Sequence, residues 1–379
     1  MSSTTIASPP PRVSVRVRHV EWGCLLAVAG LFALDGLLFR TGLYTAWLEP
    51  DSSTGEFELI LRREQQAQTR NGDNMVVTLG DSRFAYYPRA CNQIAGETGY
   101  VFRNAGVAGS DLRSWYYMLR DLDPTRRRYR AIVIGVNDYD DEDEYLNPYD
   151  DIRPLHYVAA RLRWSDALEF ARSFRNPRLR WESFRAALLK GFVMQADIHA
   201  FLSHPIKRIQ YVSQCRRGFE SWTYGYVESK ATMSGLAIDW PHLSAVEPAS
   251  FSSEQRETVQ LALLRKPAPQ TGRLAAFRHE WFGRIIDSYR ESPTKIVFVR
   301  LPRGPLVRPE NLVLKKSASI RELASRPNVL LAPEHAFDAL ERPELFKDAL
   351  HLNDEGCTLF SRMMAREIAK MLGESRHAL

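Results

Sequence analysis

The sequence predicts an α/β protein: a three-layer α/β/α sandwich around a five-stranded parallel sheet, with a large helical insertion and an N-terminal transmembrane helix. Three observations lead to this prediction. Five short apolar runs are rich in β-branched residues, helical patterns alternate with them, and one long apolar stretch lies near the amino terminus. The 379 residues are 45% hydrophobic and 25% charged, which is typical of a globular chain. The net charge of +6 comes without a basic stripe interleaved with aromatics, so we expect no nucleic-acid partner.

The amino-terminal region predicts a disordered cytoplasmic tail over residues 1–20 and a transmembrane anchor over 21–40. Residues 22–39 are nearly continuous apolar sequence, and these 18 residues would rise about 27 Å as a helix, close to a hydrocarbon core of about 30 Å. Arginines precede this stretch and acidic residues follow it, so the positive-inside rule places the remaining chain outside the cytoplasm. A cleaved signal peptide is the alternative, but its best small-residue pair, Ala27 and Ala29, falls too early in the run.

Asp35 interrupts the apolar stretch one turn from its outer end. A carboxylate is costly inside a bilayer, so the side chain is expected to reach the interface. The alternative is that it pairs with a polar group on a membrane partner.

Residues 41–73 read as a connector containing a helix over 57–68, and the first buried strand follows at 75–79. This strand ends at Gly80, after which Asp81 and Ser82 come at once. Open α/β sheets bind ligands at the carboxyl ends of their strands, so Ser82 is a candidate nucleophile. The alternative is an ordinary strand-to-helix turn with a polar cap.

The next segments repeat this pattern of strand, polar loop and helix. A helix is expected over 84–96, a strand over 100–103, and a helix capped by Asp111 that runs to 122. Between them, Gly106 and Gly109 indicate tight turns or a close approach to the backbone. The third strand, 129–134, leads into Gly135, Asn137 and Asp138. Six acidic residues lie between positions 138 and 144, but they lack calcium-loop spacing, and no metal site is expected.

Residues 151–290 change to helical patterns with aromatics and arginines, which indicates an insertion. Helices are expected over 156–174, 178–195 and 197–214. A less regular segment, 215–248, carries Trp222, Tyr224, Tyr226 and Trp240. The insertion either forms a lid or substrate platform, or uses these aromatics to pack its own core. The four cysteines match no disulfide framework, and at most one disulfide is expected outside the membrane, among Cys91, Cys215 and Cys357.

The chain then returns to the sheet. A helix over 274–289 and strands over 295–301 and 329–331 precede Asp348 and His351, and an amphipathic helix over 354–372 closes the chain. The core of the domain is thus expected in two parts, residues 74–150 and 291–379. A doubly wound order places the first and third strands side by side, so that Ser82 and Asn137 border one crevice.

These residues supply the parts of a serine esterase. A serine needs a base, and His351 suits that task; Asp348, three residues earlier, can reach its Nδ1–H. An ester carbonyl that is attacked becomes an oxyanion and needs preorganised donors. The backbone N–H groups of Ser82 and Gly109 and the amide of Asn137 are the natural three.

Four separated blocks, in the correct chain order, resemble the SGNH (GDSL-like) hydrolases. They are Gly80-Asp-Ser-Arg83, Asn104-Ala-Gly-Val-Ala-Gly109, Gly135-Val-Asn-Asp138 and Asp348-Ala-Leu-His351. A hydrophobic residue is commoner in that family where this chain has Arg83. Here Arg83 is expected to be an exposed cation at the substrate rim, meeting either an anionic substrate or only solvent.

The resemblance implies an enzyme that works through an acyl-Ser82 intermediate and needs no cofactor. Its members include esterases, lipases, carbohydrate acetylesterases and acyltransferases; the anchor and insertion favour O-acyl groups of a cell-envelope polysaccharide as the substrate. Similar anchored proteins accompany multi-span membrane acyltransferases, which makes such an enzyme the expected partner. The alternative is a non-catalytic binding or scaffold subunit of an envelope acylation complex.

Overall fold

Five parallel strands form the central sheet of this computed structural model, which describes residues 22–67, 74–141, 147–217, 229–266, 272–314 and 317–377. Across the sheet the strands follow the order β2-β1-β3-β6-β7, and every neighbouring pair is parallel. The strands are β1 (Met75–Leu79), β2 (Val101–Asn104), β3 (Ala131–Val136), β6 (Lys295–Arg300) and β7 (Val329–Leu331). Each lies within two residues of its predicted position, because β-branched apolar runs mark buried strands clearly.

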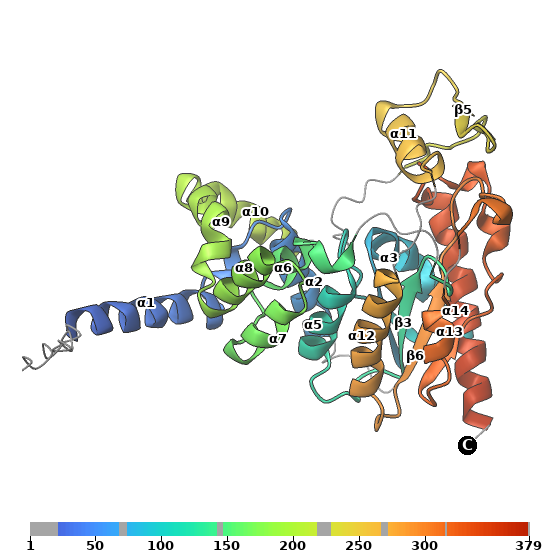
Figure 1. Cartoon of the computed structure of the whole chain (residues 1–379). Helices are drawn as coiled ribbons and strands as arrows, with labels where there is room; N and C mark the ends of the chain where they lie inside the picture. Colours follow the sequence, from blue (N-terminus) through green and yellow to red (C-terminus); the bar gives the residue numbers. More distant parts are fainter. Residues whose placement is uncertain are drawn as a thin grey trace, which may run out of the picture.

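Helices flank this sheet (Figure 1). Side chains along each strand alternate between two hydrophobic clusters, as in β1, where Val77 and Leu79 join one cluster and Val76 joins the other. The first cluster includes residues of α2 (Ser53–Ala67), α5 (Leu112–Leu122), α12 (Arg273–Ser288) and α13 (Ser319–Leu323). The second includes residues of α3 (Ser82–Tyr86), the following 3-10 helix (Tyr87–Ile94) and α14 (Asp354–His377). A short helix, α4 (Ala95–Thr98), leads into β2.

One helix, α1 (Trp22–Arg40), is long and apolar enough to cross a membrane, and it projects from the body of the protein (Figure 1). The carboxyl end of this helix contacts the first insertion helices. Asp35 is only 6% exposed and accepts hydrogen bonds from the backbone N–H groups of Lys190 (3.2 Å) and Gly191 (2.8 Å). The carboxylate that interrupts the apolar stretch therefore has its partner within this chain. The predicted tail, residues 1–20, lies outside the described residues.

Residues 151–217 and 229–266 form two separate regions in space (Figure 1), whereas α12, also within the predicted insertion, packs on the sheet. The helices that follow the loop after β3 form the first insertion region, near the carboxyl end of α1; they are α6 (Arg153–Val158), α7 (Ala167–Arg172), α8 (Pro177–Leu188), α9 (Gly191–Ser203) and α10 (Pro205–Arg217). The second region holds a two-stranded hairpin, β4 (Ala237–Asp239) and β5 (Ser244–Val246), and α11 (Ser253–Thr258). It packs against the side of the sheet that α14 covers, through Met233, Leu236 and Phe251.

The helix boundaries in the insertion differ from the predicted ones. The helix expected over 156–174 is broken between α6 and α7, and the one expected over 178–195 ends at Leu188. Apolar spacing continued across both breaks, so periodicity alone did not reveal them. The next break falls where Pro205 begins α10. All four cysteines are free, which is within the expected limit of at most one disulfide.

Candidate active site

Ser82 lies just beyond the carboxyl end of β1, as the first residue of α3. Asp81 caps this short helix, its carboxylate accepting from the Arg83 N–H at 3.0 Å. The fully buried ring of Phe84 fixes the turn against the sheet. A Cβ on Gly80 would come within 2.6 Å of the Phe84 Cβ, and one on Gly135 within 2.5 Å of its ring, so both glycines make room for this side chain.

Ser82, His351 and Asp348 lie in hydrogen-bonding contact, although Ser82 and His351 are 269 positions apart in the chain. The Ser82 Oγ is 2.9 Å from the His351 Nε2, and the His351 Nδ1 is 2.9 Å from the Asp348 Oδ2. When Nδ1 carries the proton and donates it to the carboxylate, Nε2 is left to accept the hydrogen bond of the serine. This is the arrangement that activates a serine hydroxyl.

The carboxylate of Asp348 is held in place independently of the imidazole. Its Oδ1 accepts the backbone N–H groups of Leu350 (2.7 Å) and His351 (2.8 Å), and the residue is 4% exposed. Burial acts to raise the pKa of Asp348, but the hydrogen bonds from His351 and the backbone outweigh it and hold that pKa below its usual value. The carboxylate is therefore charged at neutral pH and can stabilise a protonated His351.

Asn137 follows β3, the neighbour of β1, and its side chain is exposed at the same edge of the sheet. Its Oδ1 accepts a hydrogen bond from the Arg83 guanidinium. The amide is thereby oriented, and its Nδ2 is the group that can donate to a substrate. The sequence predicts Asn137 as a donor but does not indicate the Arg83 contact that orients it.

Gly109 belongs to the loop after β2. In the sheet, β2 borders β1 on the edge opposite to β3. The loop is joined to the turn of the candidate nucleophile, because the Val107 N–H donates to the Gly80 carbonyl at 3.1 Å. Gly109 has φ +70°, a conformation that favours glycine. A Cβ there would also lie 2.6 Å from the Tyr157 hydroxyl oxygen, so both backbone and packing require a glycine at this position.

Two residues that the sequence did not single out hold this loop. The Ala108 N–H donates to the Glu56 Oε1 at 3.1 Å, and the Tyr157 hydroxyl donates to the Ala108 carbonyl at 2.6 Å. Glu56 is 2% exposed, and burial raises its pKa to about 8, against the smaller opposing effects of the Ala108 N–H and Arg63. Neither residue belongs to a recognisable motif, since α2 and α6 bring them to the loop from distant parts of the chain.

Arg83 is not the exposed cation that the sequence predicts. Its side chain is 13% exposed, and its Nη2 lies 2.7 Å from the Asp81 Oδ2 while also contacting Asn137. Burial acts to raise the pKa of Asp81, but the Arg83 charge prevails and lowers it. Arg83 therefore links the cap of the candidate nucleophile's helix to the candidate oxyanion donor.

Two hollows meet at Asn137. One, of about 300 Å³, is the more apolar of the two: Leu112, Trp115, Leu274, Phe277 and Phe282 line it, together with polar and charged residues that include Asp111, Asp151 and Arg278. The other, of about 240 Å³, is more polar and runs between Arg83, Leu350 and the second insertion region, where Trp240 and Leu263 form part of its wall. Of the aromatic residues singled out in the sequence, Trp240 therefore lines the polar hollow. Trp222, Tyr224 and Tyr226 lie outside the described residues.

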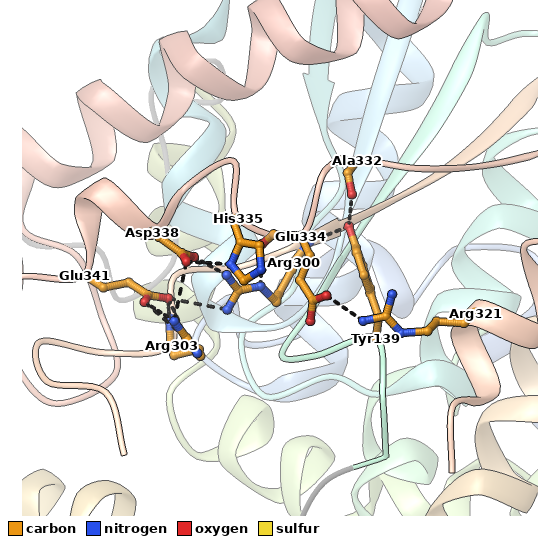
Figure 2. Close-up of polar contacts among 9 residues, drawn as sticks. All are labelled: Tyr139, Arg300, Arg303, Arg321, Ala332, Glu334, His335, Asp338 and Glu341. Carbon is orange, nitrogen blue, oxygen red and sulfur yellow. Dashed lines mark hydrogen bonds and ion pairs between the residues drawn. The ribbon is translucent and has the colours of Figure 1, made fainter. Parts of the chain in front are cut away.

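A polar network supports one wall of the second hollow (Figure 2). Arg303, which lines the hollow, is held by Glu341 through contacts of 2.6–3.1 Å. Arg300, 4% exposed, contacts Asp338 and Glu341, while the Tyr139 hydroxyl lies 2.9 Å from the Ala332 carbonyl and joins the loop after β3 to β7. The loops at this end of the sheet are thus tied to one another.

The chain offers internal comparisons for the proposed triad. His335 with Asp338 (Figure 2) and His242 with Asp239 are also His–Asp pairs three residues apart, each at 2.7 Å. Their histidines are 77% and 79% exposed, whereas the His351 side chain is 20% exposed and contacts a serine. Within the described residues no group of three or more histidine, cysteine or acidic side chains is arranged to hold a metal ion.

No family model matches this chain, and no curated protein matches it.

Proposed function

We propose that this protein is a serine ester hydrolase or O-acyltransferase of the SGNH kind, anchored in a membrane by α1. The observation that carries this proposal is the chain of contacts from Ser82 through His351 to Asp348 at the carboxyl ends of the strands. The strand order, which reads 2-1-3-4-5 when the five sheet strands are numbered along the chain, supports a flavodoxin-like α/β/α sandwich with this site at its switch point.

In the proposed reaction, His351 Nε2 removes the Ser82 hydroxyl proton as Oγ attacks the ester carbonyl carbon. The carbonyl oxygen becomes an oxyanion, which the Ser82 and Gly109 N–H groups and the Asn137 Nδ2 stabilise. When the intermediate collapses, the ester C–O bond breaks and the alcohol leaves with the proton from His351. Asp348 stabilises the imidazolium throughout, and an acyl-Ser82 remains.

The second half-reaction decides between hydrolysis and transfer. His351 removes a proton from water or from an acceptor hydroxyl, whose oxygen attacks the acyl-Ser82 carbonyl and releases the serine. We propose that the apolar hollow takes the acyl group and the polar hollow takes the alcohol. Trp240 beside polar side chains suits a sugar ring, which supports a polysaccharide as the alcohol.

The proposed setting is a cell envelope, with the amino terminus in the cytoplasm and the α/β domain outside. The apolar length of α1 supports the anchor. A multi-span membrane acyltransferase remains the proposed partner. Asp35 is not proposed to bind this partner, because the Asp35 carboxylate already accepts hydrogen bonds from the start of α9.

The test is labelling of the full chain in detergent with a fluorophosphonate probe. We expect the native protein to be labelled, Ser82→Ala to be unlabelled and His351→Asn to be labelled far more slowly. The matched control is His242→Asn, which removes an equivalent His–Asp pair away from Ser82 and should label normally. Absence of labelling in the folded native protein would favour the alternative, a non-catalytic scaffold subunit. In a separate assay an acyl ester is supplied together with polysaccharide. Acylation of the polysaccharide that is faster than the release of free acid would identify a transferase.

A further inference from the structure

The outer end of α1 is built into the first insertion region. Besides the Asp35 contacts, the Arg40 guanidinium donates to the carbonyls of Leu162 (3.1 Å) and Leu188 (3.2 Å) and lies 4.7 Å from the centre of the Trp164 ring. Phe39 is 4% exposed and packs with Met194 of α9. The direction of α1 is therefore fixed relative to α8 and α9.

These contacts set the depth of α9 relative to the membrane. Asp35, which bonds the first residues of α9, precedes Arg40 by five residues, so it lies about 7.5 Å back along the helix. The 19 residues of α1 rise about 28 Å, barely the thickness of a hydrocarbon core, and nearly all of them are needed to cross it. If α1 spans the bilayer with Arg40 at the outer boundary of the hydrocarbon core, the start of α9 lies about 7.5 Å below that boundary, within the outer leaflet.

Large apolar side chains are exposed on the helices next to the carboxyl end of α1. We name as the anchor-side surface a set of five residues from the first insertion region, each between 50% and 71% exposed: Trp164, Trp181, Phe192, Leu202 and Ile206. Phe192 directly follows Gly191, and the Arg185 guanidinium lies 4.7 Å from its ring. Trp181 is one turn before Arg185 on α8, so this part of the surface is continuous from the end of α1 along α8. Figure 1 shows α8 and α9 beside the outer end of α1, with the sheet and α14 farther from it.

The segment that leads into α8 and forms most of it is basic. Residues 172–185 contain five arginines and one acidic residue, Glu182. Tryptophan and arginine together are typical of the interfacial region of membranes, where the indole sits at headgroup level and the cation meets lipid phosphate.

We propose that the anchor-side surface lies in the outer leaflet of the same bilayer that α1 crosses. Its continuity with α1 and the depth fixed by Asp35 favour lipid over a protein partner as its occupant. The protein would then be held at two places, which fixes the orientation of the α/β domain above the membrane. This proposal rests on α1 as an anchor but not on any catalytic activity.

The test measures membrane depth with nitroxide labels on the full chain in nanodiscs of phosphatidylcholine and phosphatidylglycerol. In a Cys24→Ser background, Phe192→Cys and Leu202→Cys report on the surface. Val246→Cys is the matched control, because Val246 is an apolar residue, 73% exposed, in the hairpin of the other insertion region. Each variant is first checked for a native circular dichroism spectrum.

We expect labels at 192 and 202 to be reached by oxygen and shielded from an aqueous nickel complex, whereas the label at 246 is reached by the nickel complex. Labels at 192 and 202 as open to nickel as the one at 246 would overturn the proposal. So would release of the native chain from vesicles by alkaline carbonate, because the depth argument needs α1 in the bilayer. If the native chain has no esterase activity while the labels show the expected accessibility, only the proposed function is refuted.

Discussion

Asp348→Asn should leave the shape of the site intact while it disables the proposed base. The asparagine Oδ1 can keep both backbone hydrogen bonds, which lie at 2.7 and 2.8 Å in the native protein. Its amide nitrogen then faces the His351 Nδ1, which must become an acceptor. The ring proton consequently moves to Nε2, the atom 2.9 Å from the Ser82 Oγ, and the serine loses its base.

The expected loss is large because orientation and charge are removed together. An equivalent substitution in a serine triad lowers kcat by about 10⁴, and we expect about 10³–10⁴ here, or roughly 4–5.5 kcal/mol of transition-state stabilisation. Binding groups are untouched, so KM should change little. The assay is steady-state hydrolysis of a neutral activated ester by the full chain in detergent.

The matched control is Asp239→Asn, which alters an exposed His–Asp pair of the same spacing. It should retain native kinetics. A folded Asp348→Asn protein whose kcat lies within threefold of the native value would refute the tautomer argument, as would an equal loss in the control.

Three other substitutions probe the surroundings of the site. Gly109→Ala should cost about 1–2 kcal/mol of stability from its positive φ alone and lower kcat further, because the new Cβ would lie 2.6 Å from the Tyr157 hydroxyl oxygen; a native unfolding midpoint and kcat would contradict this. Arg83→Leu should lower kcat about tenfold with KM little changed, as expected for one lost charge-assisted hydrogen bond to Asn137, and a double-mutant cycle with Asn137→Ala should show the two effects to be non-additive. Glu56→Gln keeps the acceptor for the Ala108 N–H and should preserve activity. Burial raises the pKa of Glu56 to about 8, so as pH rises the carboxyl loses its proton in the unfolded state before it does in the native state. The free energy of unfolding of the native protein should therefore fall between pH 4.5 and about 8, and the glutamine variant should lack this part of the fall. Denaturant unfolding at several pH values measures this, and a difference in unfolding free energy between the two proteins that stays constant with pH would contradict it.

The sheet and the triad could be predicted from sequence for a local reason. Each strand is a short apolar run, and each proposed catalytic residue directly follows the end of a strand or shares a short motif with its neighbour. The parallel order then brings Ser82 and Asn137 together without further information. The four sequence blocks thus contain most of the geometry of the site.

The remaining features depend on contacts between distant segments. Glu56 and Tyr157 reach Ala108 from α2 and α6, and their sequence surroundings resemble those of any amphipathic helix. Arg83 could be read as a surface cation because its partners, Asp81 and Asn137, become neighbours only after β1 and β3 pair. Likewise, nothing beside Asp35 in sequence indicates the start of α9 as its partner.

The breaks in the insertion helices and the β4–β5 hairpin were also missed. The spacing of apolar residues continues through the ends of α6 and α8, so periodicity does not show where these helices stop. In the structure Ala159 and Ala160, directly after α6, pack in one cluster with Phe39 of α1. The hairpin strands have three residues each, too few to give an alternating pattern.

The most direct test of the central claim is to trap the acyl group on the nucleophile. The full chain would be mixed with an excess of p-nitrophenyl acetate, quenched in acid within milliseconds to seconds, digested and mapped by mass spectrometry. The account predicts one acetyl group on the peptide that carries Ser82, formed at the rate of the nitrophenol burst and absent from Ser82→Ala. Rapid ester cleavage by the native protein with Ser82 unmodified at every time point, or undiminished cleavage by Ser82→Ala, would contradict it.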